Sequence, residues 1–374
     1  MDGSRVLAAA AAYQTPLAAV DVERMEANLV AMRARADELG VRLRPHAKTH
    51  KSAYVAGRQL AQGADGLTAA TLTEAELFAR AGAADVLLAH PPVGEAKLRR
   101  VAALTERVQR LVVGLDSVDV AASLPQSVEV LWEVDCGHHR LGTAPGESTV
   151  ESVRALVRAL GVPRFLGLMT FPGHAYGVAD RQSLGVVADA ERTAMLETAG
   201  QLSKAGIACR ELSAGSTPTA SWIAASGGPD VPRLTEIRPG AYVYADAQQV
   251  ALGSATLESC ALAVVATVVS TPAADRAVVD AGSKALSADK SVAWLPGYGS
   301  VVGRPDLVLD RMSEEHGVLV APGGATRLRI GDRLAIVPVH CCTTVNLHPA
   351  VLMVEATRAW WDPVAARGWQ PSPG

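Results

Sequence analysis

Apolar and polar residues follow a strand pattern and a helical pattern in turn along the first part of the chain. Residues 22–39 carry apolar side chains every three or four positions, and Gly40 follows them as glycine often follows a helix. Short apolar runs lie on either side, at 16–21 and 41–45. The pattern therefore predicts a strand, an amphipathic helix and a second strand.

The same alternation continues over the next 160 or so residues. Further strands are predicted at 66–70, 85–89, 111–115, 128–135, 165–171 and 208–213, and further helices at 73–81, 95–106, 117–123, 148–160 and 184–204. Strands separated by helices of about 10 to 20 residues form parallel sheets. About seven or eight such units predict an α/β fold with a closed (β/α)8 barrel, and their number argues against the alternative, an open doubly wound sheet.

The pattern changes after Gly253. Short β-branched runs at 262–270, 276–280, 327–330 and 333–339 are separated by Gly, Pro and Asp, which indicates antiparallel strands joined by turns. The sequence therefore predicts a barrel domain over 1–253 and a β-rich domain over 254–374, and the first residues of the chain could join the second domain.

Composition limits the class of protein. The 374 residues carry a formal charge of −3, so the basic excess of a nucleic-acid-binding surface is missing. No apolar run reaches the roughly 18 to 20 residues of a membrane span, and no signal peptide is recognisable, which predicts a cytoplasmic protein. The five cysteines are scattered and odd in number, which favours reduced thiols over disulfides.

Residues 44–52 read Arg-Pro-His-Ala-Lys-Thr-His-Lys-Ser and concentrate positive charge directly after a predicted strand. Neighbouring cations or partial burial favour the neutral form of a lysine amine, which can then attack a carbonyl carbon. Lys48 and Lys51 are the two candidates for such a nucleophile. The alternative is a solvated basic loop, because runs of charge usually lie on the surface.

Other marked segments also follow predicted strands, at 135–140, 171–176 and 213–217. The carboxyl ends of barrel strands meet at one mouth, so these segments and Lys48 are expected to form one site. The turn Gly215-Ser216-Thr217 could bind a phosphate through its amides and hydroxyls, although Gly-Ser-Thr is more often an ordinary turn and helix cap.

The segment Pro-His-Ala-Lys-Thr-His-Lys resembles the pyridoxal-phosphate (PLP) segment of the D-threonine aldolase and D-serine dehydratase family, which has an alanine-racemase-like barrel. The first lysine holds the cofactor in that family, so the resemblance implies this role for Lys48. Segments 66–76, 280–285 and 313–317 match the family in the same order. The resemblance also implies a homodimer.

Two segments with the family's wording imply contacts with the cofactor ring. Asp-Cys-Gly-His-His-Arg-Leu-Gly resembles the family's Asp-x-Gly-x-x-Arg-x-Gly, which implies Arg140 near the phenolic oxygen; an arginine that pairs with Asp135 is the alternative. Gly-His-Ala-Tyr resembles the family's Gly-His-x-Tyr, which implies that His174 and Tyr176 stack on the ring or bond to it. Phe171 departs from the family, where a tyrosine is expected, so a hydroxyl contact is in doubt.

The segment Arg-Pro-Gly-Ala-Tyr, which begins at Arg238, resembles the Arg-x-Gly segment of racemase-like PLP enzymes. It implies that the amides of Gly240 and Ala241 meet the phosphate, which adds these two residues to the phosphate-binding turn expected at Gly215, Ser216 and Thr217. Arg238 itself is left open between a contact with the pyridine nitrogen and a structural role.

His340 and Cys342 form a possible metal pair. On a strand, residues two apart point to the same side and can share one ion, although free cysteine is commonly a small core residue. The family places a divalent metal at His-x-Cys or His-x-Asp in this segment. A thiolate ligand favours Zn²⁺, with Mn²⁺ or Mg²⁺ as alternatives. Cys341 is expected to be packing only, and His348 is left open between a further ligand and a rim residue.

Taken together, the resemblance implies a PLP- and metal-dependent lyase that acts on 3-hydroxy-D-amino acids. Either aldol cleavage to an aldehyde and glycine or dehydration to a keto acid and ammonia is expected, and the thiolate ligand leans toward dehydration. An amino-acid racemase of the same fold and a non-catalytic PLP-binding protein are the alternatives. No nucleic-acid or membrane partner is predicted.

Overall fold

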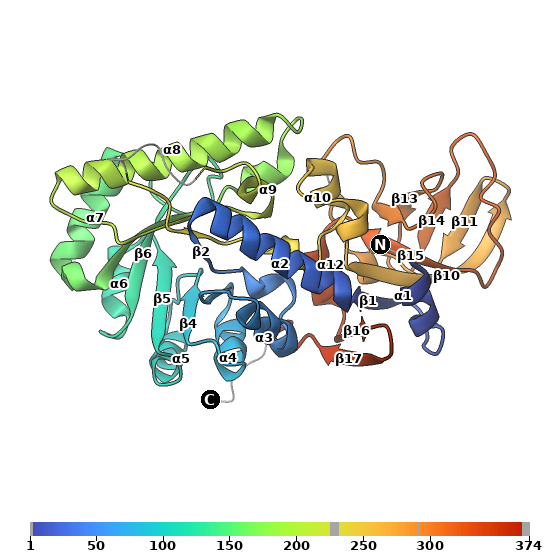
Figure 1. Cartoon of the computed structure of the whole chain (residues 1–374), viewed down its shortest axis with the longest axis horizontal. Helices are drawn as coiled ribbons and strands as arrows, with labels where there is room; N and C mark the ends of the chain where they lie inside the picture. Colours follow the sequence, from blue (N-terminus) through green and yellow to red (C-terminus); the bar gives the residue numbers. More distant parts are fainter. Residues whose placement is uncertain (1–2, 225–231, 291, 369–374) are drawn as a thin grey trace. The chain divides into compact units, whose positions relative to one another are not determined.

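The computed structural model describes residues 3–224, 232–290 and 292–368. The chain forms two compact units (Figure 1). The barrel unit comprises residues 31–48 and the described part of 53–240, and the β unit comprises the described residues up to 30, residues 49–52 and those from 241 onward. The domain limits expected from the sequence, 1–253 and 254–374, stay a prediction.

Within the described residues, the barrel unit contains a sheet of eight parallel strands. Their order around the sheet is β2 (Arg42–Leu43), β9 (Glu236–Ile237), β8 (Glu211–Ala214), β7 (Phe165–Thr170), β6 (Glu129–Val134), β5 (Arg110–Leu115), β4 (Asp85–Leu88) and β3 (Leu67–Ala69). A parallel bridge between His46 and Thr68 joins the end of β2 to β3 and closes the ring. The predicted (β/α)8 barrel is confirmed.

Helices follow the strands and lie outside the sheet (Figure 1). They are α3 (Ala53–Ala61), α4 (Leu72–Arg80), α5 (Glu95–Thr105), α6 (Val118–Ser123), α7 (Glu147–Leu160), α8 (Ser183–Lys204) and α9 (Thr217–Ala220), after α2 (Val22–Leu39), whose residues are divided between the units. The strands are buried on both faces, as parallel strands usually are. Leu87, Val112, Leu131 and Leu166 form one cluster of this core.

Arg44 is buried within the barrel unit, with only 1% of its surface exposed. Its Nε donates to Glu236 at 2.7 Å, and its two Nη atoms donate to the carboxylate of Asp85 at 2.6 and 2.8 Å. Burial opposes the charge, but these two carboxylates raise the pKa of Arg44 well above its ordinary value. A side chain on Gly66 would meet the backbone oxygen of Asp85 at 2.8 Å and Arg44 at 2.9 Å, so glycine is required there. The solvated-loop interpretation is therefore wrong for Arg44, which ties together three strands.

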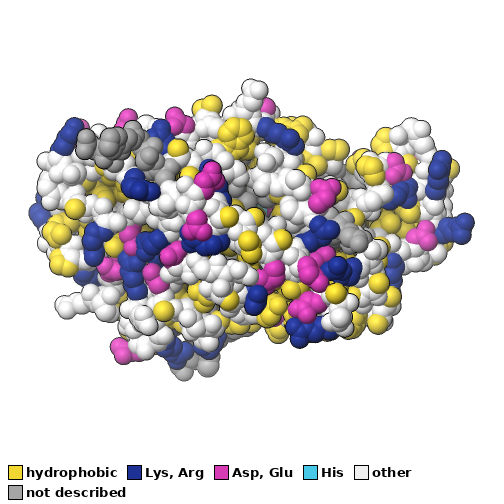
Figure 2. All heavy atoms as spheres, viewed as in Figure 1, with side chains coloured by type: hydrophobic (Ala, Val, Ile, Leu, Met, Phe, Trp, Pro, Cys, Tyr) yellow, Lys and Arg dark blue, Asp and Glu magenta, His cyan; other side chains and the backbone are white. Residues whose placement is uncertain are grey.

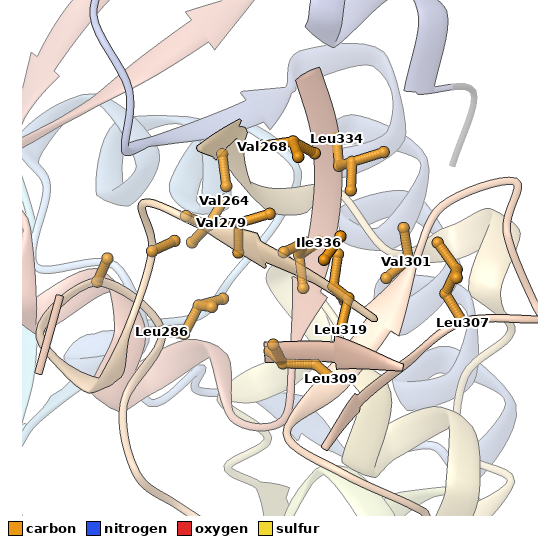
Figure 3. Packing of buried hydrophobic residues seen from close by; sticks show 14 of the residues in the cluster. Val264, Val268, Val279, Leu286, Val301, Leu307, Leu309, Leu319, Leu334 and Ile336 are labelled. Atoms are coloured by element: carbon orange, nitrogen blue, oxygen red, sulfur yellow. The ribbon is translucent and has the colours of Figure 1, made fainter. Parts of the chain in front are cut away.

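The β unit contains a sheet of nine described strands. Their order is β11 (Arg276–Val279), β14 (Gly317–Val320), β13 (Val308–Met312), β12 (Gly299–Val301), β15 (Arg333–Pro338), β10 (Leu262–Ala273), β1 (Leu17–Asp21), β16 (Ala350–Val354) and β17 (Ala359–Pro363). Because β11 also pairs with β10, six of these strands close into an antiparallel barrel. Its core is apolar and includes Val264, Val279, Leu319 and Ile336 (Figure 3).

The β unit corrects two expectations. The strand predicted at 16–21 exists as β1, but it pairs with β10 and β16 and takes no part in the parallel barrel. The strand predicted at 327–330 is absent, since this described segment has no regular structure. The short helices α1 (Gly3–Ala10), α10 (Ala247–Leu252), α11 (Ser283–Leu286) and α12 (Cys341–Leu347) complete this unit.

The visible surface carries charges of both signs. Figure 2 shows basic and acidic side chains mixed over this face, with no continuous patch of either sign. That face therefore lacks the basic stripe that a nucleic-acid-binding surface requires. Among the described residues, no helix combines the length and the apolar character needed to cross a membrane.

Candidate active site

A cavity of about 360 Å³ opens in the barrel unit. It is lined by His46, Lys48, Ala70, Ala89, His90, Arg140, Leu141, Met169, Phe171, Gly215 and Arg238. Most of these residues directly follow a barrel strand, so the cavity lies at the carboxyl ends of the strands, where barrel enzymes have their active sites. Its volume suits a small-molecule ligand.

Lys48 lies in the 3-10 turn Ala47–Thr49, shortly after β2. Its Nζ is 5.3 Å from the ring centroid of Phe171 and has no hydrogen bond or ion pair with any residue that the structure describes. Lys51 differs, because it belongs to the β unit and donates to Oδ1 of Asn346 at 2.8 Å. Of the two lysines considered as nucleophiles, the geometry favours Lys48.

The cavity is lined by basic groups. His46, Lys48, His90, Arg140 and Arg238 face it, and none of the described lining residues is acidic. Burial lowers the pKa of His46 well below its ordinary value, and the charges of Lys48, Arg238 and Arg140 lower it further, so this imidazole is neutral near pH 7. Its buried Nδ1 lacks a hydrogen-bond partner among the described residues. The cavity is therefore suited to an anionic occupant with polar atoms.

Arg140 lies over the face of Phe171, with its guanidinium carbon 4.8 Å from the ring centroid. Its nearest carboxylate is Glu133, at 3.7 Å. Burial raises the pKa of Glu133, although Arg140 and Arg238 act in the opposite direction. Asp135 instead accepts the N–H of His139 at 3.0 Å and lies 2.8 Å from that imidazole. The alternative in which Arg140 pairs with Asp135 is therefore not observed.

Arg238 is 6% exposed and is fixed from two sides. Its guanidinium donates to the hydroxyl of Ser213 and to the backbone carbonyl of Thr170, which belong to β8 and β7. These bonds anchor the side chain to the barrel, and it also lines the cavity. Of the two roles that the sequence left open for Arg238, these bonds establish the structural one.

The first predicted phosphate loop begins at Gly215, which lines the cavity and has a left-handed backbone with φ of 82°. Its N–H donates to Oε1 of Glu191 in α8 at 2.7 Å. Burial raises the pKa of Glu191 to about 7, although hydrogen bonds from Gly215 and Thr219 lower it. The other carboxylate oxygen of Glu191 is buried without a hydrogen-bond partner among the described residues. Sequence reasoning missed this residue.

The two predicted phosphate loops meet inside the barrel unit. The N–H of Gly240 donates to the hydroxyl of Thr217 at 3.0 Å, and the N–H of Ser216 donates to the hydroxyl of Thr219 at 2.9 Å. Ser216 therefore also caps the short helix α9. Ala241 falls in the β unit. The phosphate role of these residues stays a prediction.

His174 and Tyr176 lie in a 3-10 turn, Gly173–Gly177, and are not among the described residues that line the cavity. A side chain at Gly137 would lie 3.5 Å from the ring of His174, so the segments 135–140 and 171–176 are adjacent. Nδ1 of His174 is buried without a hydrogen-bond partner among the described residues. The contacts predicted for these two residues with the cofactor ring stay a prediction.

The predicted metal pair lies in the β unit, but not on a strand end. His340 is the N-cap residue of α12, and Cys342 is the second residue of this helix. The argument from strand alternation is therefore wrong. The start of the helix brings the two side chains together. Burial lowers the pKa of the His340 imidazole, whereas the charge of Cys342 and its hydrogen bond to His340 raise it.

Asp246 and Thr49 support this pair, and sequence reasoning found neither. Oδ2 of Asp246 lies 3.3 Å from Nδ1 of His340, and Oγ1 of Thr49 lies 3.1 Å from Sγ of Cys342. Burial opposes a charge on His340, but Cys342 and Asp246 raise its pKa well above the ordinary value. No sequence signal connects residues so far apart in the chain.

The other candidates near the pair have structural partners. Nε2 of His348 bonds to the carbonyl of Ala285 at 2.9 Å, which fits a packed histidine. Cys341 is fully buried. The described residues contain no group of three or more His, Cys, Asp or Glu side chains arranged to hold a metal. Any metal held here by His340 and Cys342 therefore keeps open positions.

The parallel barrel and the antiparallel β unit define the alanine-racemase class of fold. An alanine racemase from Clostridium difficile superposes with a TM-score of 0.63 over 94% of this chain and 99% of its own, at 13% identity, which shows the fold alone. A family model for the alanine racemase N-terminal domain matches residues 20–248, and a model for a putative serine dehydratase domain matches residues 261–354.

The chain belongs to the D-threonine aldolase and D-serine dehydratase family. It is 37% identical to D-threo-3-hydroxyaspartate dehydratase from Delftia sp. over 95% of this chain and 98% of that protein, and the structure of that enzyme superposes with a TM-score of 0.84. It is 33% identical to D-threonine aldolase from Arthrobacter sp. over 96% of this chain and 94% of that protein. The expected family is confirmed.

Proposed function

We propose that this protein is a PLP- and divalent-metal-dependent lyase that dehydrates 3-hydroxy-D-amino acids to a keto acid and ammonia. The observation that carries the proposal is the amine of Lys48, which has no bonding partner among the described residues, in a cavity lined only by basic and uncharged groups. Such an amine is available to hold a carbonyl cofactor.

The cavity fits PLP. The cofactor carries a phosphate and a phenolic oxygen, and the basic lining offers Arg140 and Arg238 to these negative charges. The unpartnered Nδ1 of His46 offers a further polar contact. When bound, the cofactor supplies an electron-accepting ring for the electrons released at the substrate's α-carbon.

The donor set at His340 and Cys342 fits a soft divalent metal. An imidazole and a thiolate are ligands that Zn²⁺ prefers, and the open positions leave room for a substrate hydroxyl. Solved structures of D-threo-3-hydroxyaspartate dehydratase include a variant with a cysteine replaced by alanine in the metal-free form and a variant with a histidine replaced by alanine. The two replaced positions lie two residues apart, as His340 and Cys342 do here.

Each residue of the candidate site has its own role in the proposed reaction. Nζ of Lys48 would hold the cofactor and, when not bonded to it, would accept and hold the proton from the substrate's α-carbon. Arg140 and Arg238 bind and orient anionic groups in the cavity. His46 is neutral, so one ring nitrogen can accept a hydrogen bond. His340 and Cys342 would hold a divalent ion, which would supply a Lewis acid for a hydroxyl group.

Aldol cleavage is the second candidate, favoured by the similarity to the Arthrobacter D-threonine aldolase. The same parts serve both reactions, and the Cys342 ligand supports dehydration. The homodimer and the cytoplasmic location stay predictions.

Product analysis distinguishes the candidates. Purified protein supplied with PLP is incubated with D-threonine, D-serine and D-threo-3-hydroxyaspartate, with and without a chelator, and aldehyde, glycine, keto acid and ammonia are measured separately. We expect keto acid and ammonia in equal amounts, and loss of both on chelation that Zn²⁺ reverses. Aldehyde with glycine would instead establish the aldolase. Interconversion of enantiomers that survives chelation would establish a racemase, and bound PLP without turnover a non-catalytic protein.

A further inference from the structure

The four residues that follow Lys48, 49–52, pack within the β unit against α12. Oγ1 of Thr49 lies 3.1 Å from Sγ of Cys342, and Nζ of Lys51 donates to Oδ1 of Asn346 at 2.8 Å. Cys342 and Asn346 are four residues apart in the helix, and residues at this spacing lie on one face. Residues 49–52 therefore contact two positions on the face of α12 that carries Cys342.

The segment itself is firmly held. Thr49, His50 and Ser52 are each 1% exposed or less, and the carbonyl of Lys51 accepts the N–H of Ala366 at 3.3 Å. Lys51 has a left-handed backbone with φ of 51°, a conformation that a non-glycine residue adopts only when its surroundings require it. The hydroxyl of Thr49 is thus presented to the sulfur by a fixed backbone.

We propose that Thr49 is a positioning residue for the metal ligand Cys342, an inference that rests on the metal centre of the proposed function. A thiolate has no proton to give, so the Thr49 hydroxyl donates to it when Cys342 binds a metal. A hydrogen bond to a charged acceptor is stronger than a neutral one, and it stabilises the thiolate in the orientation that the metal requires. Thr49 thereby orients the side chain of Cys342, as the nearby carboxylate of Asp246 orients the imidazole of His340.

The test compares the Zn²⁺ affinity of full-length metal-free proteins by competition with a chromophoric chelator. Thr49→Val removes the hydroxyl and keeps the branched shape, and we expect Zn²⁺ binding to weaken about 10- to 100-fold, as for other groups that support metal ligands. Thr49→Ser keeps the donor and should stay within about threefold of the wild type. Thermal unfolding of each metal-free variant checks that the fold is kept.

The matched control is Thr343→Val. Thr343 lies in the same helix and is exposed. Its hydroxyl bonds to Asp289 at 2.6 Å and to the backbone carbonyl of His340 at 3.1 Å, but to neither ligand side chain, so its loss should leave Zn²⁺ affinity unchanged. In proteins loaded with Co²⁺, the sulfur-to-cobalt absorption should shift in Thr49→Val alone, because this band reports on the sulfur.

Each outcome decides the inference. Equal Zn²⁺ affinity and an unchanged cobalt spectrum in Thr49→Val would overturn it, and so would equal weakening in Thr49→Ser or in Thr343→Val, which would indicate helix packing alone. Wild-type protein that binds no Zn²⁺ would overturn the proposed metal centre and this inference with it. Weakening confined to Thr49→Val supports it.

Discussion

The carboxylate of Asp246 joins the side chain of His340 to the start of α12. Its Oδ2 lies 3.3 Å from Nδ1 of His340 and accepts the backbone N–H of Cys341 at 3.0 Å, while Oδ1 accepts the N–H of Gln249 at 2.8 Å. A carboxylate this close to Nδ1 attracts that edge of the imidazole and so orients the ring, with Nε2 left as the nitrogen that a metal would bind.

Replacing Asp246 by Asn should weaken Zn²⁺ binding about 10- to 100-fold, because the amide cannot supply the charge that fixes the imidazole. Asparagine also caps helices well, so the start of α10 should be kept. Chelator competition on the full-length metal-free protein measures the affinity. Asp289→Asn is the control, since Asp289 bonds to Thr343 and not to either proposed ligand. An unchanged Zn²⁺ affinity in Asp246→Asn would contradict the role given to this carboxylate.

Most barrel elements could be predicted because their patterns are local. The predicted helices 22–39, 95–106 and 184–204 differ from α2, α5 and α8 by at most one residue at an end. The sequence missed α3, the four-residue helix α9 and the two-residue strand β9; the last two are too short to give a clear period. It left open whether β1 belongs to the other sheet, because an apolar strand has the same pattern whichever strand it pairs with.

The residues of the candidate site that follow barrel strands could be predicted from the sequence. Lys48, Arg140 and Gly215 line one cavity, as their places after strands indicate. His90 directly follows a predicted strand and could have been found by the same rule. Asp246 and Thr49 could not, since each reaches its partner across more than 90 residues of chain and only packing brings them together.

Replacing Arg44 by Met should lower the free energy of unfolding by about 3 kcal/mol, the lower end for breaking a buried ion pair, because Glu236, which is buried, and Asp85, which is half-buried, lose their shared cation but keep Arg42 and Arg110. Denaturant unfolding of the full-length protein measures the effect. Arg99→Met is the matched control: its pair with Glu95 is exposed and should contribute less than about 1 kcal/mol. Similar losses in both variants would argue against a special role for Arg44.

The buried carboxyl of Glu191 should make stability depend on pH. Its pKa in the folded protein is about 7 against an ordinary value of 4.5, so the folded state binds more protons between these values. Its contribution is present below about pH 4.5 and is lost as the pH rises through about 7, by about 3 kcal/mol in total.

Glu191→Gln should therefore be more stable than the wild type at about pH 8 and similar to it at about pH 5, because the amide resembles the neutral acid. Thermal unfolding of both proteins at the two pH values tests this, with Glu197→Gln, an exposed position of the same helix, as the control. A stability difference that is the same at both pH values would show that Glu191 does not titrate in this range.

The most direct test of the proposed function is to identify the lysine that holds the cofactor. Full-length protein loaded with PLP is reduced with borohydride, digested, and mapped by mass spectrometry, with Lys48→Ala as the control. We predict that the cofactor label is found on the peptide that contains Lys48 and is absent from the control. A label on Lys51 or on any other lysine, or a wild-type protein that takes up no cofactor, would contradict the account.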